Sequence, residues 1–350
     1  MAIKFHLIYN RILYMKIIKV IYFQRKPILG YYSLEFIANE LKNKLSNKLN
    51  INTIICKYDN SGLLKKIYNL CNSYFLQGKV NHIIGDIHYI SIFFKRNTTI
   101  LTIADCTFME NTSYLYRIIF KYVWLYIPSK RVYRIVAISH YTKNKILEYL
   151  PSLSYDKINV IYVPISKIFK SSYKVFNKYK PRILHIGTAP NKNLSNLIKA
   201  LKGLSCQLVI IGKLNQTYIT ELQNNNIDYL NYYNLSEKKI FQQYCESDIV
   251  SFISIYEGFG MPIIEANITG RVVITSNLTS MPEIAGNAAK IINPYNIEDI
   301  RIGFLDLINN DDYRNNLIIN GFTNALRFDS NYIANQYFDL YKEINDKYLL

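Results

Sequence analysis

Short apolar runs alternate with helix-like segments along nearly the whole chain, and this alternation limits the fold more than any other feature. Two series of strands are predicted, the first over residues 15–23, 51–56, 80–84, 99–103, 134–138 and 159–163, and the second over residues 182–186, 207–211, 227–230, 249–255, 272–275 and 290–292. Because a helix between two strands usually joins them in parallel, each series is expected to form a mostly parallel sheet. The predicted fold class is α/β with two doubly wound domains.

A basic segment separates the two series. Residues 166–180 have no clear period and precede Pro181, where the second series begins. We predict a first domain over 1–170, a linker over 171–180, a second domain over 181–330, and a helix over 331–350 that packs back on the first domain. The length of 350 residues suits two domains. Residues 1–14 precede the first strand, so Met1 and Met15 both remain open as the native start.

Composition restricts the class of protein. Half of the residues are hydrophobic and 19% are charged, which excludes a disordered chain. Lys and Arg exceed Asp and Glu by 42 − 25 = 17, so an anionic partner is expected, either nucleic acid or acidic lipid. The five cysteines lack C-x-x-C spacing, which favours a reducing cytoplasm. Because no long apolar stretch or signal peptide is recognisable, we expect a protein that neither spans a membrane nor is secreted by that route.

Two glutamates bracket a glycine-rich turn after the strand over 249–255. Gly258 and Gly260 let a ligand approach the backbone, and the helix that follows presents free N–H groups that suit a phosphate. Glu265 is expected in the first helical turn, where it can reach a diol such as a ribose. Glu257 precedes the turn and is expected to face the group that is bonded to the phosphate. The segment therefore predicts a cradle for a nucleotide sugar.

Other loops that follow strands are further candidates, because ligands of such sheets bind beyond the carboxyl ends of the strands. Lys192 follows the strand that ends near Gly187 and can neutralise a diphosphate. His88 and Asp105 follow two strands of the first domain and are expected to face the cleft. Two interpretations of Asp105 stay open, catalysis and capping of the next segment. A metal site built from His82, Asp86 and His88 is disfavoured by their loose spacing, and Ser139 is expected to cap a helix.

Together these motifs resemble the retaining glycosyltransferases of family 4 type, also called glycosyl transferases group 1. The E-x7-E signature is matched by Glu257 and Glu265 with Gly258-Phe259-Gly260-Met261-Pro262 between them. Residues 187–194, 279–286 and 137–143 resemble further parts of the family, and the similarity runs from about Met15 to the C-terminus. The resemblance implies the GT-B fold, in which two Rossmann-like domains face a central cleft.

The resemblance also implies roles for individual residues. Glu257, Lys192 and Asp105 are expected to be catalytic. The expected donor-binding residues are Gly187, Thr188, Lys192, Glu257, Gly258, Phe259, Gly260, Met261 and Glu265, and the expected acceptor-side residues are Gly30, Tyr31 and His88. No cofactor and no metal are expected, since a lysine and a helix N-terminus replace a divalent ion. Two positions depart from the family pattern. Ala104 stands where the family frequently has a histidine. Asn191 stands where it frequently has a basic residue, and Arg25 or Lys26 is expected to supply the missing positive charge.

The expected function is retaining transfer of a hexose, such as mannose or glucose, from a nucleotide diphosphate sugar to a lipid-linked glycan of a bacterial surface polysaccharide. We expect a cytoplasmic protein that associates peripherally with the anionic inner face of the cytoplasmic membrane and does not bind nucleic acid. Two alternatives remain: an inactive relative that binds a nucleotide sugar, suggested by Ala104, and a basic nucleic-acid-binding protein, suggested only by charge. The aromatic stretch over residues 114–127 either lies on a membrane surface or packs within the first domain, and packing is favoured.

Overall fold

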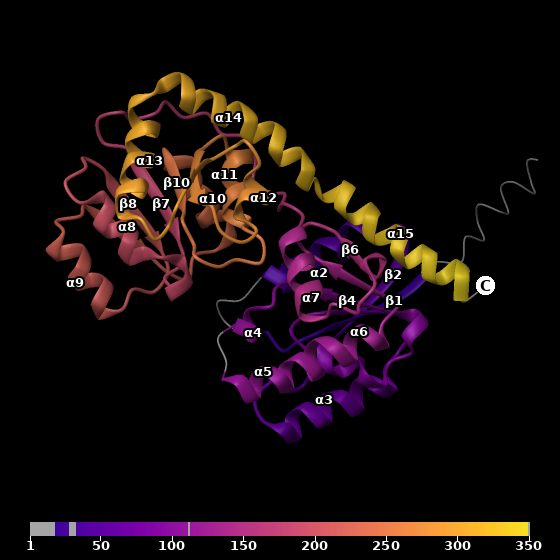
Figure 1. Ribbon diagram of the computed structural model, residues 1–350. Coiled ribbons are helices and arrows are strands. Elements are labelled where there is room, and N and C mark those ends of the chain that lie inside the picture. The colour runs from indigo at the N-terminus through magenta and orange to yellow at the C-terminus, as the bar shows by residue number, and fades with distance from the viewer. Residues whose placement is uncertain (1–17, 28–32, 111–112, 349–350) are drawn as a thin grey trace, which may run out of the picture.

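The computed structural model describes residues 18–27, 33–110 and 113–348, and these residues form two domains joined by a linker (Figure 1). Each domain contains a six-stranded sheet in which every pair of neighbouring strands is parallel. The predicted α/β class with two doubly wound domains is therefore confirmed.

The first sheet has the order β2-β1-β3-β4-β5-β6. Its strands are β1 (Ile18–Gln24), β2 (Leu49–Ile55), β3 (Val80–Ile84), β4 (Thr99–Ile103), β5 (Arg134–Ala137) and β6 (Ile158–Val160). Strands β3 and β4 are buried at every position, as expected for central strands of a parallel sheet. The predicted strand over 159–163 is wrong at its end, because β6 stops at Val160. Residues 15–17 and the loop residues Gly30 and Tyr31 lie outside the described residues.

The second sheet has the order β12-β11-β10-β7-β8-β9. Its strands are β7 (Arg182–Ile186), β8 (Gln207–Ile211), β9 (Tyr229–Tyr232), β10 (Ile249–Phe252), β11 (Val272–Ser276) and β12 (Lys290–Ile292). Two predicted strands were misplaced. Ile227 donates its N–H to Leu222 O and so closes a helix instead of starting β9, and Ile255 donates to Asn191 O, so the chain has already left β10.

Helices cover both sheets. In the first domain they are α2 (Ser33–Leu45), α3 (Leu63–Phe75), α4 (Thr107–Glu110), α5 (Tyr114–Phe120), α6 (Ile127–Arg131) and α7 (His140–Tyr149), with the short helix η1 (His88–Phe93) and the π-helical η3 (Lys121–Tyr126). In the second domain they are α8 (Leu194–Leu201), α9 (Gln216–Asn224), α10 (Glu237–Glu246), α11 (Met261–Thr269), α12 (Met281–Ala285), α13 (Ile297–Asn309) and α14 (Asp311–Ala325). Ser139 caps α7 through its side chain, as predicted, and Ser236 caps α10 in the same way.

The last helix, α15 (Ser330–Tyr348), leaves the second domain and runs along the first (Figure 1). The hydroxyl of Tyr341 donates to the Tyr22 hydroxyl at 3.0 Å and lies 2.7 Å from His82 Nδ1. On its other side, His82 Nε2 is 2.7 Å from Thr102 Oγ1. Burial lowers the pKa of His82 to about 3, so this ring is neutral. His82 is therefore a core residue, and among the described residues no cluster suits a metal ion.

The stretch over residues 114–127 departs from the favoured prediction that it packs within the first domain. Trp124 and Leu125 are buried, but Tyr114 and Leu115 are exposed and α5 has no buried residue. In the part of the chain that the structure describes, every helix is too short or too polar to span a bilayer.

Candidate active site

The candidate site lies where the order of the second sheet reverses. Strands β7 and β10 are neighbours, yet β8 lies outside β7 and β11 lies outside β10, so the loops after β7 and β10 diverge at this point. Ligands of open parallel sheets bind in the crevice that such diverging loops leave. The loops are residues 187–193 and 253–260, which contain the two motifs singled out in the sequence.

Gly187 allows the loop after β7 to fold tightly over Lys192. Its φ is 98°, and a Cβ at this position would lie 2.8 Å from Lys192 Cγ. Any other residue would push the lysine stem away. The adjacent Thr188 donates its hydroxyl to Lys213 O at 2.9 Å and thereby ties this loop to the one after β8.

Lys192 and Glu257 form an ion pair across the crevice. Lys192 Nζ lies 2.6 Å from Glu257 Oε1, and the two side chains are only 22% and 16% exposed. Asn191 Nδ2 donates to the same oxygen at 3.3 Å and to Tyr256 O at 3.0 Å. Asn191 therefore positions Glu257, a role that the sequence reasoning missed because it considered only the charge that this position lacks.

Hydroxyl groups hold the turn between Glu257 and α11. Ser280 Oγ donates to Glu257 O at 3.0 Å and to Phe259 O at 2.6 Å, and Glu257 N–H donates to Thr279 Oγ1 at 3.2 Å. Gly260, with φ 128°, is the N-cap of α11, and Pro262 lies within the first two positions of the helix, where a proline is favourable. The start of α11 thus follows directly on the loop after β10, and the first N–H groups of a helix suit an anionic ligand.

Glu265 does not lie in the first turn of its helix, so this expectation was wrong. Because α11 begins at Met261, Glu265 is its fifth residue. Tyr244 donates its hydroxyl to Glu265 Oε2 at 2.5 Å. Burial raises the pKa of Glu265 to about 7, against the weaker opposing effect of that hydrogen bond. Near neutral pH this carboxyl is therefore balanced between its two protonation states.

The first domain closes over the same turn. A Cβ at Gly258 would lie 2.4 Å from Ala104 O and 2.9 Å from Asp105 Cβ. Ser139 Oγ donates to Gly258 O at 2.9 Å. Asp105 thus lies next to the turn that follows Glu257. Its Oδ1 accepts from Thr107 N at 2.9 Å and from Thr107 Oγ1 at 2.6 Å, so it also holds the start of α4.

Glu283 makes a second connection between the domains. Its carboxylate accepts the backbone N–H groups of His140, at 2.7 Å, and of Tyr141, at 3.0 Å. Both groups belong to the first turn of α7, where an acidic partner is favourable. Glu283 lies within residues 279–286, one of the segments that resemble the family. Its hydrogen-bond partners in α7 could not be predicted from the sequence, because they belong to the other domain.

Some predicted site residues do not face the cleft. Phe259 is 5% exposed and packs against Tyr162 and Phe328, so only its backbone can contact a donor. His88 is 3% exposed, and its Nδ1 lies 2.9 Å from Trp124 O, so the expected polar lining is wrong for this residue. Arg25 Nε lies 2.9 Å from Glu35 Oε1, so the charge expected to compensate for Asn191 is paired with a carboxylate of its own domain.

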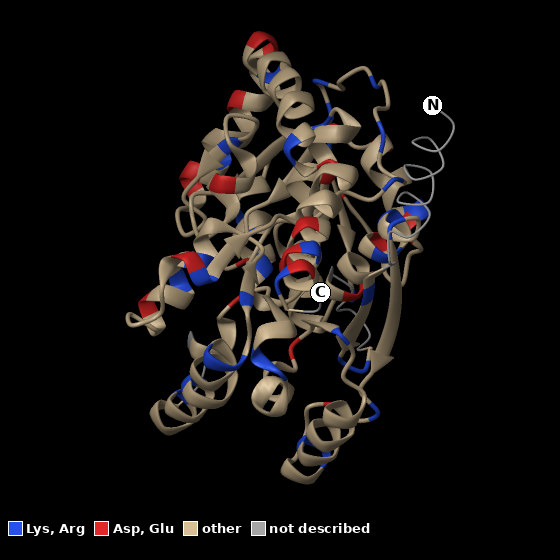
Figure 2. Ribbon diagram, turned by 90° about the vertical axis from the view of Figure 1, so that its right-hand side faces the viewer, with Lys and Arg blue, Asp and Glu red and all other residues tan. Residues whose placement is uncertain are grey.

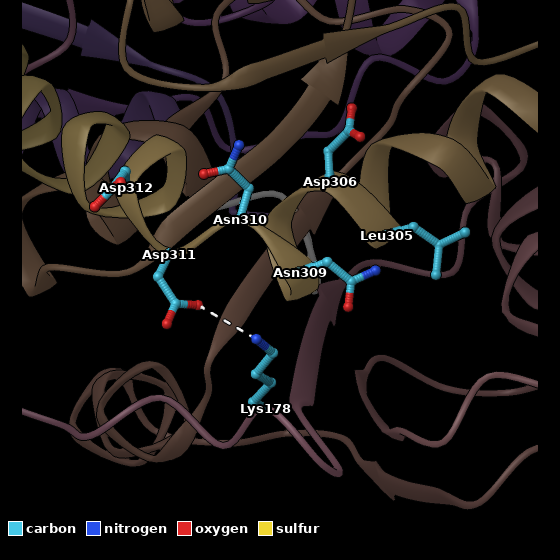
Figure 3. A pocket seen from close by; sticks show the side chains of 7 residues that line it. All are labelled: Lys178, Leu305, Asp306, Asn309, Asn310, Asp311 and Asp312. Atoms are coloured by element: carbon cyan, nitrogen blue, oxygen red, sulfur yellow. Dashed lines mark ion pairs between the residues drawn. The ribbon is translucent and has the colours of Figure 1, made fainter.

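A hollow of about 500 Å³ on the second domain is unsuited to an anionic ligand. It lies between the linker and the junction of α13 and α14 (Figure 3), and its lining residues are Lys178, Leu305, Asp306, Asn309, Asn310, Asp311 and Asp312. Its lysine pairs with Asp311 at 4.0 Å. Because three carboxylates line it, a diphosphate would be repelled there.

Comparison with known proteins finds similarity to a family in the second half of the chain. The family described as glycosyl transferases group 1 matches residues 167–323. O-antigen chain mannosyltransferase B of Escherichia coli is 29% identical over 173 residues, which cover 45% of this chain and 45% of that protein. O-antigen chain mannosyltransferase RfbU of Salmonella typhimurium is 26% identical over 209 residues, or 57% of each chain. The matched region thus spans about half the length of these relatives.

Solved structures extend the similarity of fold to both domains. The crystal structure of Anabaena Alr3699/HepE in complex with UDP superposes with a TM-score of 0.73 and 12% identity, over 93% of this chain and 100% of that one. The chain therefore has the predicted GT-B fold, and its residues 167–323 are similar to the family described as glycosyl transferases group 1.

Proposed function

We propose that the protein is a retaining glycosyltransferase that moves a hexose from a nucleotide diphosphate sugar to a lipid-linked glycan in bacterial surface polysaccharide synthesis. The observation that carries the proposal is the Lys192–Glu257 pair, which lies at the reversal point of the second sheet next to the start of α11. A cation, a helix N-terminus and carboxylates at one crevice suit a sugar whose leaving group is a diphosphate.

Donor binding would change the partner of Lys192. The diphosphate attracts the ammonium group more strongly than a single carboxylate does, because it carries more negative charge. Lys192 and the first N–H groups of α11 would hold the diphosphate, and Glu257, released from its ion pair, would accept a hydroxyl of the sugar. Glu265 would accept the ribose hydroxyls, with Thr188 and the backbone of Gly187, Gly258, Gly260 and Met261 around the donor.

The transfer step would proceed on one face of the sugar. The acceptor hydroxyl attacks the anomeric carbon from the side on which the diphosphate leaves, and the departing oxygen takes the acceptor proton. The protein then stabilises the leaving charge and aligns both substrates, with Asp105 on the acceptor side. Because Lys192 and the helix N-terminus supply the positive charge, we expect transfer to be independent of metal, and chelation of divalent cations should leave the rate unchanged.

The sugar and the compartment follow from different observations. Two relatives are named O-antigen mannosyltransferases, so mannose is the favoured hexose. The surplus of 42 − 25 = 17 positive charges favours the anionic inner face of the cytoplasmic membrane, where lipid-linked glycans are extended.

A screen of nucleotide sugars by thermal unfolding tests the proposal. A bound donor raises the melting temperature by mass action, so one class of nucleotide sugar should stabilise the protein. Lys192→Ala and Glu257→Ala should lose most of that stabilisation and at least about tenfold of the transfer rate, equal to about 1.4 kcal/mol of activation free energy. Lys199→Ala, which removes an exposed lysine of α8, is the matched control. Full activity in both site variants would contradict the site.

A catalytically inactive nucleotide-sugar-binding protein is the second candidate. It is favoured by Ala104, whose carbonyl lies against Gly258 and which, by the family resemblance, replaces a frequent histidine. Stabilisation by a nucleotide sugar without transfer to any glycan acceptor, in the presence of cell-derived lipid-linked glycans, would support this alternative.

A further inference from the structure

Helix α3 is oriented with its polar side toward the protein. The residues that it buries are Asn69 and Ser73. Asn69 is bonded to both backbone groups of Tyr58 and to the Tyr89 hydroxyl. The opposite side presents Leu64, 82% exposed, and Phe75, 80% exposed. A surface helix of a globular domain normally turns its apolar side toward the core and its polar side toward solvent. The exposed apolar side of α3 therefore indicates a surface that binds an apolar partner.

Helix α5 continues this apolar surface. Six of its seven residues, in the sequence Tyr-Leu-Tyr-Arg-Ile-Ile-Phe, are aromatic or aliphatic, yet none is buried. Tyr114 is 75% exposed and Leu115 is 70% exposed. Below them, Trp124 of η3 packs into the domain, and Lys66 Nζ of α3 lies 4.9 Å from its ring centre. The two helices therefore border the same layer of the first domain.

The charges on this surface are almost all positive. Residues 60–85 and 113–147 contain no Asp or Glu, whereas α3 carries Lys65 and Lys66, and residues 114–131 carry Arg117, Lys121, Lys130 and Arg131. The neighbouring Asp59 is paired with Lys65 at 3.0 Å. In Figure 2 acidic residues gather in the upper part of the molecule, whereas the helices at the lower end, where Figure 1 places α3 and α5, carry mainly basic residues.

We infer that the outer sides of α3 and α5 form a membrane-docking face for a bilayer that contains anionic phospholipid. Apolar side chains would enter the interface between headgroups and acyl chains, and the lysines and arginines would contact phosphate groups. A second copy of the chain fits this face less well, because symmetric pairing would bring the same cations together. The inference rests on the proposed function only in that a lipid-linked acceptor would be reached from this position, since α5 follows closely on Asp105.

Vesicle binding by the full chain tests the face directly. The protein should bind vesicles of phosphatidylcholine mixed with phosphatidylglycerol, bind vesicles of phosphatidylcholine alone far less, and dissociate as salt is raised. The double variants Leu64→Ser/Phe75→Ser and Leu115→Ser/Ile119→Ser should each weaken binding about tenfold or more, because each removes two apolar side chains from the bilayer. The control is Ile319→Ser/Leu326→Ser in the second domain, where the residues are 63% and 73% exposed.

A fluorophore on Cys71 gives a second readout. Cys71 is exposed and lies two helical turns from Leu64 on the same side of α3, whereas Cys56, Cys106 and Cys206 are buried. An environment-sensitive dye attached there should shift to shorter wavelength when anionic vesicles are added. A similar shift on raising protein concentration without vesicles would overturn the inference in favour of self-association.

The remaining outcomes also decide the question. Equal vesicle binding by the wild type, both variants and the control, or no binding to anionic vesicles, would overturn the docking face. Thermal stabilisation by the nucleotide sugar is measured on the same preparations. If the donor still stabilises a protein that ignores vesicles, only the docking face fails, whereas vesicle binding without any response to nucleotide sugars would refute the transferase and keep the face.

Discussion

Gly258 meets the first domain so closely that a side chain has no room. A Cβ there would lie 2.4 Å from a backbone oxygen, which cannot rotate away as a flexible side chain can. The glycine of the motif therefore has two functions, a backbone open to a ligand and the close approach of the domains. Only the first was predictable from the sequence.

Replacement of Gly258 by alanine should separate the domains at the site. Gly258→Ala is expected to lower the free energy of unfolding by about 1–3 kcal/mol and the transfer rate by about tenfold or more, because Asp105 moves away from Glu257. Urea unfolding and initial rates measure the two effects. Gly203→Ala adds a methyl group in open space at φ 73° and should cost about 1 kcal/mol without changing the rate. Equal rates for Gly258→Ala and the wild type would contradict this account of the contact.

The raised pKa of Glu265 predicts a specific dependence of stability on pH. The folded protein holds this proton up to a pKa of about 7, whereas the unfolded chain releases it near 4.5, so the folded state binds more protons between these values. Stability contributed by this group is present below about pH 4.5 and falls as pH rises toward 7. Glu265→Gln should remove a decrease of about 2 kcal/mol between about pH 5.5 and about pH 8. Parallel stability profiles of the two proteins would show that the carboxyl titrates normally.

At the scale of the elements, the sequence predicted the regular parts well and the departures poorly. Five strands, β3, β4, β7, β8 and β12, have the predicted bounds, because buried parallel strands are continuous apolar runs between turn residues. Errors arose where a segment bonds outside its sheet, as Ile255 does with Asn191. Such long-range hydrogen bonds leave no local pattern.

The candidate site shows the same division. The loops that contain Glu257 and Lys192 were recognisable from glycine placement after strands, and the structure brings them together at 2.6 Å. The supporting contacts of Asn191, Ser280 and Glu283 join segments that are far apart in the sequence. No local sequence pattern shows which of these segments lie next to each other. The exposure of α5 was also unpredictable, since an apolar pattern alone does not distinguish a helix that faces the core from one that faces outward.

Helix α15 is attached to the first sheet by a buried polar network, which gives a prediction at this scale. Tyr341→Phe removes a hydroxyl that is bonded to Tyr22 and close to His82, and it leaves buried polar atoms without a partner. The free energy of unfolding should fall by about 1–3 kcal/mol. Tyr332→Phe, which changes a residue of the same helix that is 57% exposed, should change it by less than about 0.5 kcal/mol. If the two variants are equally stable, the network contributes nothing to the docking of α15.

At the scale of the whole molecule, the two domains are connected by the chain in both directions and by side chains at the cleft. Ile165 donates its N–H to Phe328 O where the chain that leaves the first domain passes the chain that returns to it. Ser139 and Glu283 join the domains beside the candidate site. Any separation of the two domains at the site would therefore break the contacts at Gly258 and α7.

The central claim, that a diphosphate binds between Lys192 and the start of α11, is tested most directly by a crystal structure with UDP or GDP. The account predicts a diphosphate within hydrogen-bonding distance of Lys192 Nζ and of backbone N–H groups in the turn from Gly258 to Met261, with the ribose beside Glu265. A nucleotide bound elsewhere, or an unchanged Lys192–Glu257 pair with the crevice empty at saturating nucleotide, would contradict it.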